Sequence, residues 1–426
     1  MIIKKIERLK ERKNFIKISQ NFFYLVLTNG VNFVLPVLIM PFLLQRLGIE
    51  KFGLVMTAQA LMSFLLIIPE YSFNNTGTQL VSLNRDNKNE IERIFNSVFT
   101  TKLFLISLSF LILLLLLLLY PRFWMEKKMF LLSFGIVIGK TLLPVWFFQG
   151  VEQMKFIAYG NIVAKTLLTF FILHFITDES QYLYVNFFYS IGDIIAGILS
   201  TFLLKQTMKI NIKITDFSSI KEQLQTGWHL LLITFSINTY VNVNILILGS
   251  LTNNSVAGLY SIAEKVMLFA KQIASIFLQA TYPHLCKLVM ESESKSKKFL
   301  RIELLFFFLF FAGFGIGLIT FSSEICIFFN KVEIVETTNY IKYFSIVPLI
   351  VSLNMPAYQS LIIHGRKKEL TIINVVGAIG CVILNYLLVP FFFATGTVIS
   401  IIITELFLSI GINVILVFKY KQYRFI

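Results

Sequence analysis

The chain has 426 residues, of which 56% are hydrophobic and 14% are charged, and it contains 45 phenylalanines. Soluble domains carry about 25% charged residues, so this composition excludes an ordinary soluble globular protein. The formal net charge of +15 would suit a nucleic-acid partner, but the placement of the basic residues indicates a membrane topology instead. The composition therefore predicts an all-α, multi-pass integral membrane protein.

The first 19 residues are basic, with isoleucine and leucine recurring near helical spacing. They predict a short amphipathic helix on an anionic membrane surface. A signal peptide is the competing interpretation, but the following apolar run is too long for one and lacks a clear small-residue cleavage site. The three cysteines lie in different segments at different predicted depths, so no disulfide framework is expected.

Twelve apolar segments follow, each near the ~20 residues that a helix needs to cross a bilayer. They lie at 20–44, 52–80, 95–120, 129–149, 156–177, 182–204, 222–249, 256–280, 299–322, 338–363, 369–390 and 395–418. Pro69, Glu70 and the polar run 74–79 interrupt the second segment, which predicts a kinked helix facing a cavity. The predicted organisation is a basic segment 1–19, a six-helix half 20–204, a cytoplasmic linker 205–221, a second six-helix half 222–418 and a basic cytoplasmic tail 419–426.

Lysine and arginine residues set the expected orientation, because they concentrate in cytoplasmic loops. With the N-terminus in the cytoplasm, 26 of the 38 basic residues fall on the inner side, 6 on the outer side and 6 within spans. This asymmetry favours an even number of helices with both termini inside. The excess of positive charge is then topological and requires no nucleic acid.

An internal repeat connects the two predicted halves. Residues 52–64 and 257–269 align at a constant offset of 205, with identical residues that include Gly53 and Gly258. Both segments run inward from an outer loop, so they indicate a parallel repeat of two six-helix halves around a central cavity, a recurring transporter design. Common packing composition of two membrane helices is the alternative explanation.

Charged residues within the predicted spans are the candidate site, because ionised groups in a bilayer usually face a bundle interior or a wet cavity. The candidate substrate-binding cations are Lys140, Lys165, Lys265 and Lys271, and the candidate ion-coupling or pairing acids are Glu70, Asp193, Glu264 and Glu405. Lysines suit phosphates or acidic sugars, and a carboxylate could bind a coupling proton or sodium ion. Alternatively, these residues are ion pairs that fix the helix packing and contact no ligand. No metal site and no other cofactor are expected.

A membrane glycan polymerase or transferase is the enzyme alternative. It would require a sizeable outer loop or an acidic pair presented at a membrane edge, and Asp178–Glu179 is the one adjacent outer acidic pair. Gly313, Gly315 and Gly317 lie within an apolar segment and predict close helix packing rather than a dinucleotide site.

The block Pro144–Lys155 (PVWFFQGVEQMK) resembles a signature of bacterial polysaccharide flippases of the Wzx type, in the MOP superfamily that also contains MATE efflux proteins. Its motif residues are Trp146, Phe147, Phe148, Gln149, Gly150, Glu152 and Lys155. The resemblance extends to 47–53, to 245–249 with 258–265, and to 282–283. Ser72 stands where a glycine would be expected, and Lys165 where an arginine would be more usual.

This resemblance implies a MATE-like fold and transport of a repeat unit linked to undecaprenyl diphosphate, from the inner to the outer leaflet of the bacterial cytoplasmic membrane. The product would enter O-antigen or capsule assembly. The implied partners are the lipid-linked oligosaccharide, membrane lipids and, beyond these, glycan polymerase and chain-length proteins. A MATE-like, ion-coupled exporter of small molecules is the alternative, since fold alone does not define function.

Overall fold

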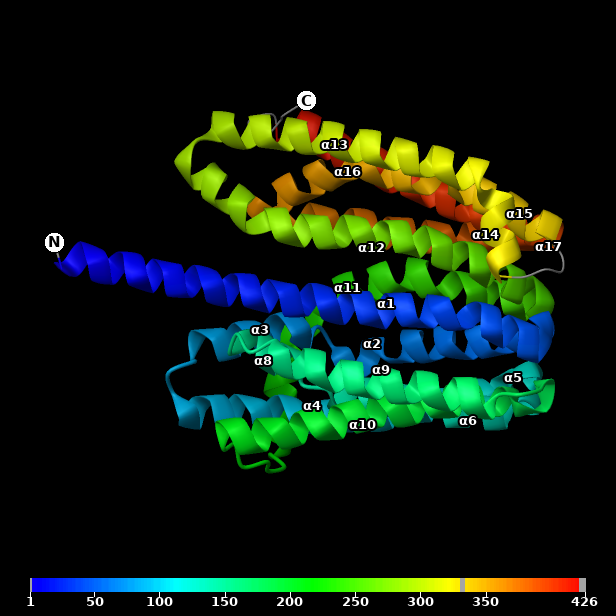
Figure 1. The fold of residues 1–426 in the computed structure, drawn as a ribbon, viewed down its shortest axis with the longest axis horizontal. Helices are drawn as coiled ribbons and strands as arrows, with labels where there is room; N and C mark the ends of the chain where they lie inside the picture. The colour runs from blue at the N-terminus through cyan, green and yellow to red at the C-terminus, as the bar shows by residue number, and fades with distance from the viewer. Residues whose placement is uncertain (1, 330–333, 421–426) are drawn as a thin grey trace. The chain divides into compact units, whose positions relative to one another are not determined.

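The computed structural model describes residues 2–329 and 334–420, and it describes their side chains from residue 20 onward except at a few positions. Within these residues the chain is helical and contains no β-strand (Figure 1). Nine candidate spans among them are long and apolar enough to cross a membrane. This confirms the predicted all-α membrane class, whereas the count of twelve spans stays a prediction.

Two compact units make up the chain. The first contains Met1–Ile39 and Leu65–Leu231, and the second contains Met40–Phe64 and Leu232–Ile426. Segment 40–64, which belongs to the first predicted half, thus packs within the second unit. Helices α1 (Ile2–Leu65) and α11 (Phe217–Leu251) each contribute residues to both units. The boundaries of the two six-helix halves stay predictions.

The first unit is built around α10, which packs chiefly against α7 and α9. Its other elements are short helices and one long one, α4. In chain order they are α2 (Ile67–Glu70), α3 (Phe73–Leu83), α4 (Lys88–Leu119), α5 (Pro121–Met125), α6 (Lys127–Ser133), α7 (Gly135–Leu142), α8 (Val145–Gly150), α9 (Lys155–Phe175) and α10 (Tyr182–Met208). Figure 1 shows α9 and α10 running side by side along the unit.

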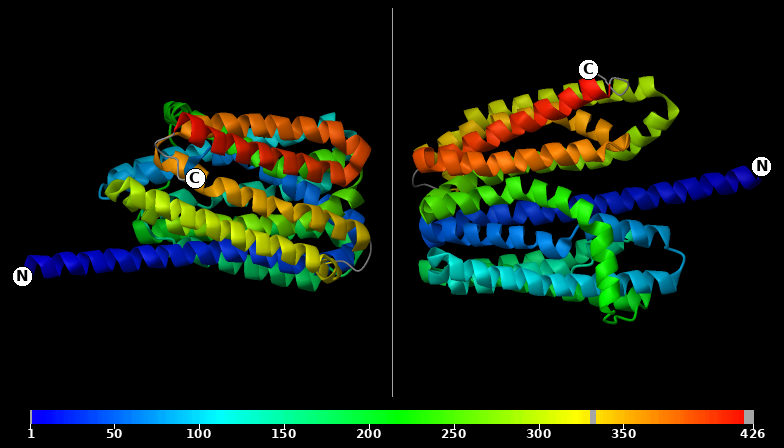
Figure 2. Two further views of the ribbon diagram at one scale, coloured as in Figure 1. Left: turned by 90° about the horizontal axis from the view of Figure 1, so that it is seen from above. Right: turned by 180° about the vertical axis from the view of Figure 1, so that it is seen from behind.

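The second unit has α16 near its centre, packed against α12, α13 and α17. Its elements are α12 (Asn254–Glu291), α13 (Glu293–Thr320), α14 (Ser322–Phe329), α15 (Ile334–Phe344), α16 (Ile346–Ile363) and α17 (Lys367–Val414), with a π-helical turn at Ile415–Lys419. The stretch 323–337, read from the sequence as a loop, therefore contains α14 and the start of α15. Figure 2 shows the long α17 from two further directions.

The predicted terminal segments are only partly described. The backbone of residues 2–19 is helical and continuous with the rest of α1, but its side chains, and with them the predicted amphipathic face, lie outside the described set. Of the basic tail 419–426, only Lys419 and Tyr420 are described.

Several helices are interrupted. Gly48 (φ +69°) divides α1 between the first two predicted spans, and Phe393 (φ +50°) divides α17 between the last two. Tyr71 and Ser72, both left-handed, separate α2 from α3 directly after Pro69. Proline lacks an N–H group and cannot continue the hydrogen-bond ladder, and α7 accordingly ends at Leu142, just before Pro144. Non-helical backbone within a membrane protein is tolerated where protein buries it or where it lines a cavity.

Exposure along α4 is the inverse of that in a soluble helix. Leu111, Leu115 and Leu118 are 57%, 57% and 66% exposed, whereas Thr101 and Ser109 are fully buried. Apolar side chains that face outward suit lipid, and small polar side chains between helices permit close packing and hydrogen bonding. This pattern supports the membrane assignment independently of composition.

The two repeat segments contact each other at their identical glycines. A Cβ atom added to Gly53 would lie 1.8 Å from the carbonyl oxygen of Asn254 and 2.8 Å from the amide nitrogen of Gly258. A Cβ atom on Gly258 would lie 2.7 Å from the carbonyl oxygen of Ile49. Only glycine allows two helices to approach this closely. Both segments belong to the second unit, so the shared glycine has one packing role in both copies.

Candidate functional site

Lys165 on α9 and Asp193 on α10 form a buried ion pair in the first unit. The Lys165 ammonium lies 3.1 Å from the Asp193 carboxylate, and both side chains are less than 10% exposed. The ammonium also lies 5.5 Å from the centre of the Tyr189 ring, a position suited to a cation–π contact. The second oxygen of Asp193 has no hydrogen-bond partner among the described residues. The structure thus brings together a candidate substrate-binding cation and a candidate ion-coupling or pairing acid.

Glu70 pairs with a lysine that the candidate set did not contain. The carboxylate lies 3.4 Å from the ammonium of Lys102 on α4, whose side chain is 3% exposed. Asn74, one turn further on, donates a hydrogen bond of 2.8 Å to the other oxygen of Glu70. The left-handed residues Tyr71 and Ser72 turn the chain directly after this carboxylate, so the helix break positions Glu70 beside α4.

A third ion pair, in the second unit, joins α12 to the C-terminal part of α17. The Lys271 ammonium pairs with the Glu405 carboxylate, which is 3% exposed, and it lies 5.7 Å from the centre of the Tyr240 ring. A buried polar contact joins α17 to α11, where Asn385 donates a 3.0 Å hydrogen bond to Asn244. Burying two charges costs free energy that only good geometry repays, so these contacts fix how α11, α12 and α17 pack.

Glu264 and Lys265 are adjacent on α12 but have different surroundings. Glu264 is buried and accepts a hydrogen bond of 2.9 Å from the Tyr260 hydroxyl, one turn earlier on the same helix. Lys265 is partly exposed and forms no hydrogen bond or ion pair within the described part of the chain. Lys265 thus differs from Lys165 and Lys271, which are both held in ion pairs.

Lys140 is an exposed residue near the C-terminal end of α7. The neighbouring Gly139 packs against α10, since a Cβ there would lie 2.3 Å from the backbone carbonyl carbon of Asp193. Lys140 points away from that contact, because successive helix positions differ by about 100°. The Lys140 and Lys165 side chains thus have different environments although both belong to the first unit.

The motif block 144–155 forms a packing core. Trp146, Phe147 and Phe148 are each at most 1% exposed, and their rings pack in one hydrophobic cluster with Phe95. Gly77 on α3 accommodates the indole, because a Cβ at Gly77 would lie 2.7 Å from the Trp146 ring. The aromatic residues of the motif therefore hold α8 against α3 and α4.

The polar motif residues form the turn that follows α8. Gly150 is buried against Val81, and its carbonyl oxygen accepts a 3.2 Å hydrogen bond from Arg85. Arg85 also pairs with Glu152 at 3.0 Å, and Glu152 has a positive φ of 57°. Gln149 is partly exposed and Lys155 is exposed. The motif is thus a structural connection between α3, α8 and α9.

One buried polar cluster in the second unit was missed by sequence reasoning. Glu303 on α13 is 4% exposed and accepts a 2.8 Å hydrogen bond from Thr281 on α12. Gln359 on α16 donates to the carbonyl oxygen of Leu278 at 3.2 Å. Glu303 is a lone acid close to the predicted start of a span, a position that indicates a membrane-face residue. The 20 uncharged residues that follow it, 304–323, were the signal in the sequence that this acid could lie deeper in the membrane.

Comparison with solved structures defines the class of protein. An inward-facing multidrug resistance MATE family transporter of the MOP superfamily matches with a TM-score of 0.70, covering 90% of this chain and 92% of that one at 11% identity. The inward closed conformation of the lipid II flippase MurJ matches with a TM-score of 0.59, covering 95% and 89% at 16% identity. The chain therefore has the fold of MOP-superfamily membrane transporters, as predicted.

Sequence comparison then defines the family. The profile described as "Polysaccharide biosynthesis protein" matches residues 18–289, and the chain belongs to this family, which confirms the predicted resemblance. A curated protein of Escherichia coli (strain K12) is 24% identical over 393 residues, covering 92% of this chain and 95% of that protein. One of Shigella dysenteriae is 27% identical, covering 91% and 97%. Both are named "Putative O-antigen transporter", and neither name is that of an enzyme.

Proposed function

We propose that this protein is a flippase that moves oligosaccharide repeat units linked to undecaprenyl diphosphate from the inner to the outer leaflet of the bacterial cytoplasmic membrane. The family match over residues 18–289 carries this proposal. The names of the two curated relatives and the fold shared with MurJ support it. The glycan would serve O-antigen or capsule assembly, and both termini would lie in the cytoplasm, in agreement with the distribution of lysine and arginine.

The mechanism proposed is alternating access by two six-helix halves, with the polar headgroup passing through the protein while the lipid tail stays in the bilayer. Buried ion pairs in membrane helices fix packing and register, and Lys165–Asp193 and Lys271–Glu405 have this geometry. Headgroup binding is then assigned chiefly to Lys265, which is partly exposed and forms no ion pair within the described residues, and secondly to Lys140, which is exposed. An ammonium group suits a diphosphate as a point charge with three donors.

Alanine replacements test which lysines bind the headgroup and which stabilise the packing. Lys265→Ala should lower export of surface glycan by about tenfold or more while the protein level stays normal, because a lost charge-assisted contact costs ~1.5–3 kcal/mol. Lys165→Ala should lower the amount of folded protein as well, since it leaves Asp193 buried without its counter-charge. Surface glycan labelling together with quantitative immunoblotting separates the two results. Normal glycan in Lys140→Ala, Lys265→Ala and their double variant would contradict the assignment.

Ion coupling is a further part of the proposal. Glu264 is the acid best suited to bind a proton or sodium ion, because it is buried and forms no ion pair within the described residues. Glu70, Asp193 and Glu405 already pair with lysines. Flipping rates in vesicles that are unaffected by imposed proton and sodium gradients would contradict coupling at any of these acids.

Export of small molecules is the second candidate function, since the chain shares its fold with a MATE transporter. Such exporters need no lateral opening for a lipid tail. Parallel assays of the purified chain with a lipid-linked oligosaccharide and with a lipophilic cationic dye distinguish the two functions. Glycan polymerase and chain-length proteins remain proposed partners, which co-purification would test.

A further inference from the structure

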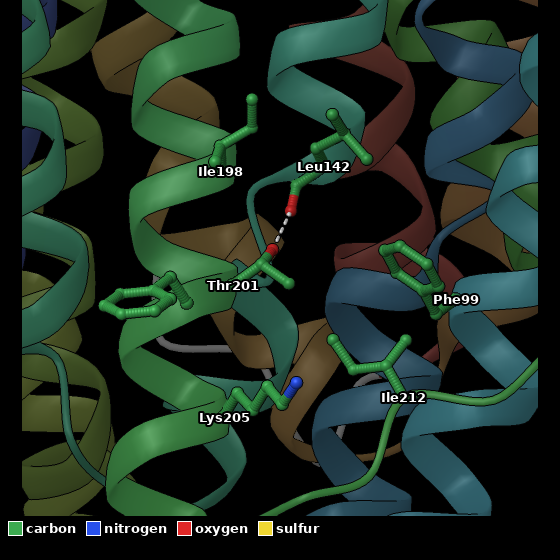
Figure 3. A pocket seen from close by; sticks show the side chains of 7 residues that line it. Phe99, Leu142, Ile198, Thr201, Lys205 and Ile212 are labelled. Carbon is green, nitrogen blue, oxygen red and sulfur yellow. Dashed lines mark hydrogen bonds between the residues drawn. The ribbon is translucent and has the colours of Figure 1, made fainter.

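A pocket of about 330 Å³, lined in part by exposed apolar side chains, lies in the first unit, at the end of α10 that the lysine and arginine count assigns to the cytoplasm. Four elements form it, namely α4, α7, α10 and the chain after α10. Phe99, Leu142, Ile198, Thr201, Phe202, Lys205 and Ile212 line it. Figure 3 shows the Lys205 side chain extending toward the space between Ile212 and Phe99.

The interruption before Pro144 leaves the last carbonyl groups of α7 without helical partners. Thr201 on α10 donates a 3.1 Å hydrogen bond to the carbonyl oxygen of Leu142, drawn as a dashed line in Figure 3. An unsatisfied carbonyl group would make the pocket costly for a hydrocarbon chain to fill. Thr201 satisfies this group, and the wall of the pocket is otherwise largely apolar.

The connection after α10 is held in place over the pocket. Asn96 on α4, which is 5% exposed, donates a 2.9 Å hydrogen bond to the carbonyl oxygen of Asn211 and accepts one of 2.9 Å from the amide of Lys213. Thr100 accepts a hydrogen bond of 3.1 Å from the amide of Thr215. These contacts fix the position of Ile212, so the pocket is a built feature of the unit.

Positive charge and exposed apolar side chains alternate along this connection. Lys205, Lys209 and Lys213 are exposed and form no side-chain hydrogen bond or ion pair within the described residues. Ile214 and Phe217 are 82% and 69% exposed. The nearest acid in sequence, Asp216, accepts hydrogen bonds from the hydroxyls of Ser218 and Ser219, which lower its pKa. A segment with this composition suits the boundary between acyl chains and anionic headgroups.

We infer that this pocket binds one anionic phospholipid of the cytoplasmic leaflet, with an acyl chain between Phe99, Ile198 and Ile212 and its phosphate on Lys205. The phosphate supplies the counter-charge that Lys205 lacks, and the apolar wall excludes water from the chain. This lipid is distinct from the transported glycolipid. It would stabilise the connection between α10 and α11.

Photo-crosslinking tests the inference on the full chain in vesicles. The probes are phosphatidylglycerol and phosphatidylcholine, each with a diazirine on one acyl chain, and labelled peptides are identified by mass spectrometry. We expect phosphatidylglycerol to label residues 96–104 and 198–217 at least about fivefold more than phosphatidylcholine does, in keeping with the attraction of a lysine to an anionic surface. Equal labelling by the two lipids would overturn the inference.

Three variants separate a specific site from general attraction to a basic membrane face. Lys205→Gln should reduce the preference for phosphatidylglycerol about fivefold. Lys88→Gln, at an exposed lysine of the same predicted face, should leave it unchanged. Ile198→Trp should abolish labelling in the pocket without loss of charge, and Ile198 is 56% exposed, so the larger side chain need not disturb the core. Equal effects of the two lysine variants, or full labelling in Ile198→Trp, would refute the site.

Discussion

Ser72 stands where the family resemblance leads one to expect glycine, and its backbone explains that expectation. Ser72 has φ +61° and follows Tyr71 at φ +41°. This left-handed conformation costs a residue with a Cβ atom roughly 1–2 kcal/mol of conformational free energy, whereas glycine adopts it without this cost. The sharp turn that positions Glu70 is therefore retained here at a conformational cost.

Replacing Ser72 with glycine should stabilise the protein by about 1 kcal/mol, because the backbone strain is relieved. Thermal unfolding of the purified protein in detergent measures the change. Ser72→Ala is the matched control, since it removes the same hydroxyl group but keeps the Cβ atom. A glycine variant no more stable than the alanine variant would show that the backbone at residue 72 is not strained.

The pair Lys165–Asp193 makes a stronger prediction. Asp193→Asn leaves a buried ammonium group without its counter-charge and should destabilise the first unit by about 3 kcal/mol or more. The double variant Lys165→Met with Asp193→Leu should recover most of this loss, because an apolar pair of similar size often replaces a buried ion pair without cost. Thermal unfolding provides the comparison. A double variant as unstable as Asp193→Asn would show that the pair does more than fix packing.

The charged residues also show where sequence reasoning stops. Their depth in the membrane follows from the hydropathy pattern. The sequence left two roles open for each of them, contact with a ligand or pairing with another charged residue. Which role holds depends on how each helix is rotated about its axis, and hydropathy does not determine this in a chain so uniformly apolar. Lys102 lay within a predicted span, but nothing in the sequence connected it to Glu70, which is 32 positions away.

At the level of helices, the repeat alignment predicted equivalent roles for Gly53 and Gly258, and the structure adds that the two residues touch. The sequence interruption at Pro69 correctly indicated a broken helix, whereas the break before Pro144 falls inside the predicted span 129–149. The break at Phe393 falls between the predicted spans 369–390 and 395–418, but its positive φ could not be foreseen, because a bulky aromatic residue rarely adopts one. The packing role of the aromatic motif could not be predicted either, since the same residues would also suit a lipid-facing surface.

Gly53→Ala should destabilise the protein by about 1–3 kcal/mol, because its Cβ atom would overlap the carbonyl oxygen of Asn254 and force the two helices apart. Gly30→Ala is the matched control. A Cβ atom at Gly30 meets nothing within 4 Å, and alanine is favoured over glycine within a helix. We expect thermal unfolding to shift downward only for Gly53→Ala. Equal shifts would show that the close approach of the repeat helices is unimportant for stability.

For the whole molecule, composition and the placement of lysine and arginine predicted the membrane class, and the family signature predicted the MOP-type fold. Both are properties of long stretches, so errors at single residues average out. The division into units was harder to foresee. Segment 40–64 packs with the second unit. The hydropathy of a segment shows that it crosses the membrane but not which bundle it joins.

Export of a lipid-linked glycan is the central claim, and it is tested most directly by reconstituting the purified full chain in vesicles. The measurement is the appearance on the opposite leaflet of an undecaprenyl-diphosphate oligosaccharide, detected by a membrane-impermeant glycosidase. We predict rapid transfer that requires the protein and is reduced about tenfold or more in Lys265→Ala, whereas Lys88→Gln transfers at the parental rate. Transfer equal to that of protein-free vesicles, with cationic dye exported by the same preparation, would contradict the account.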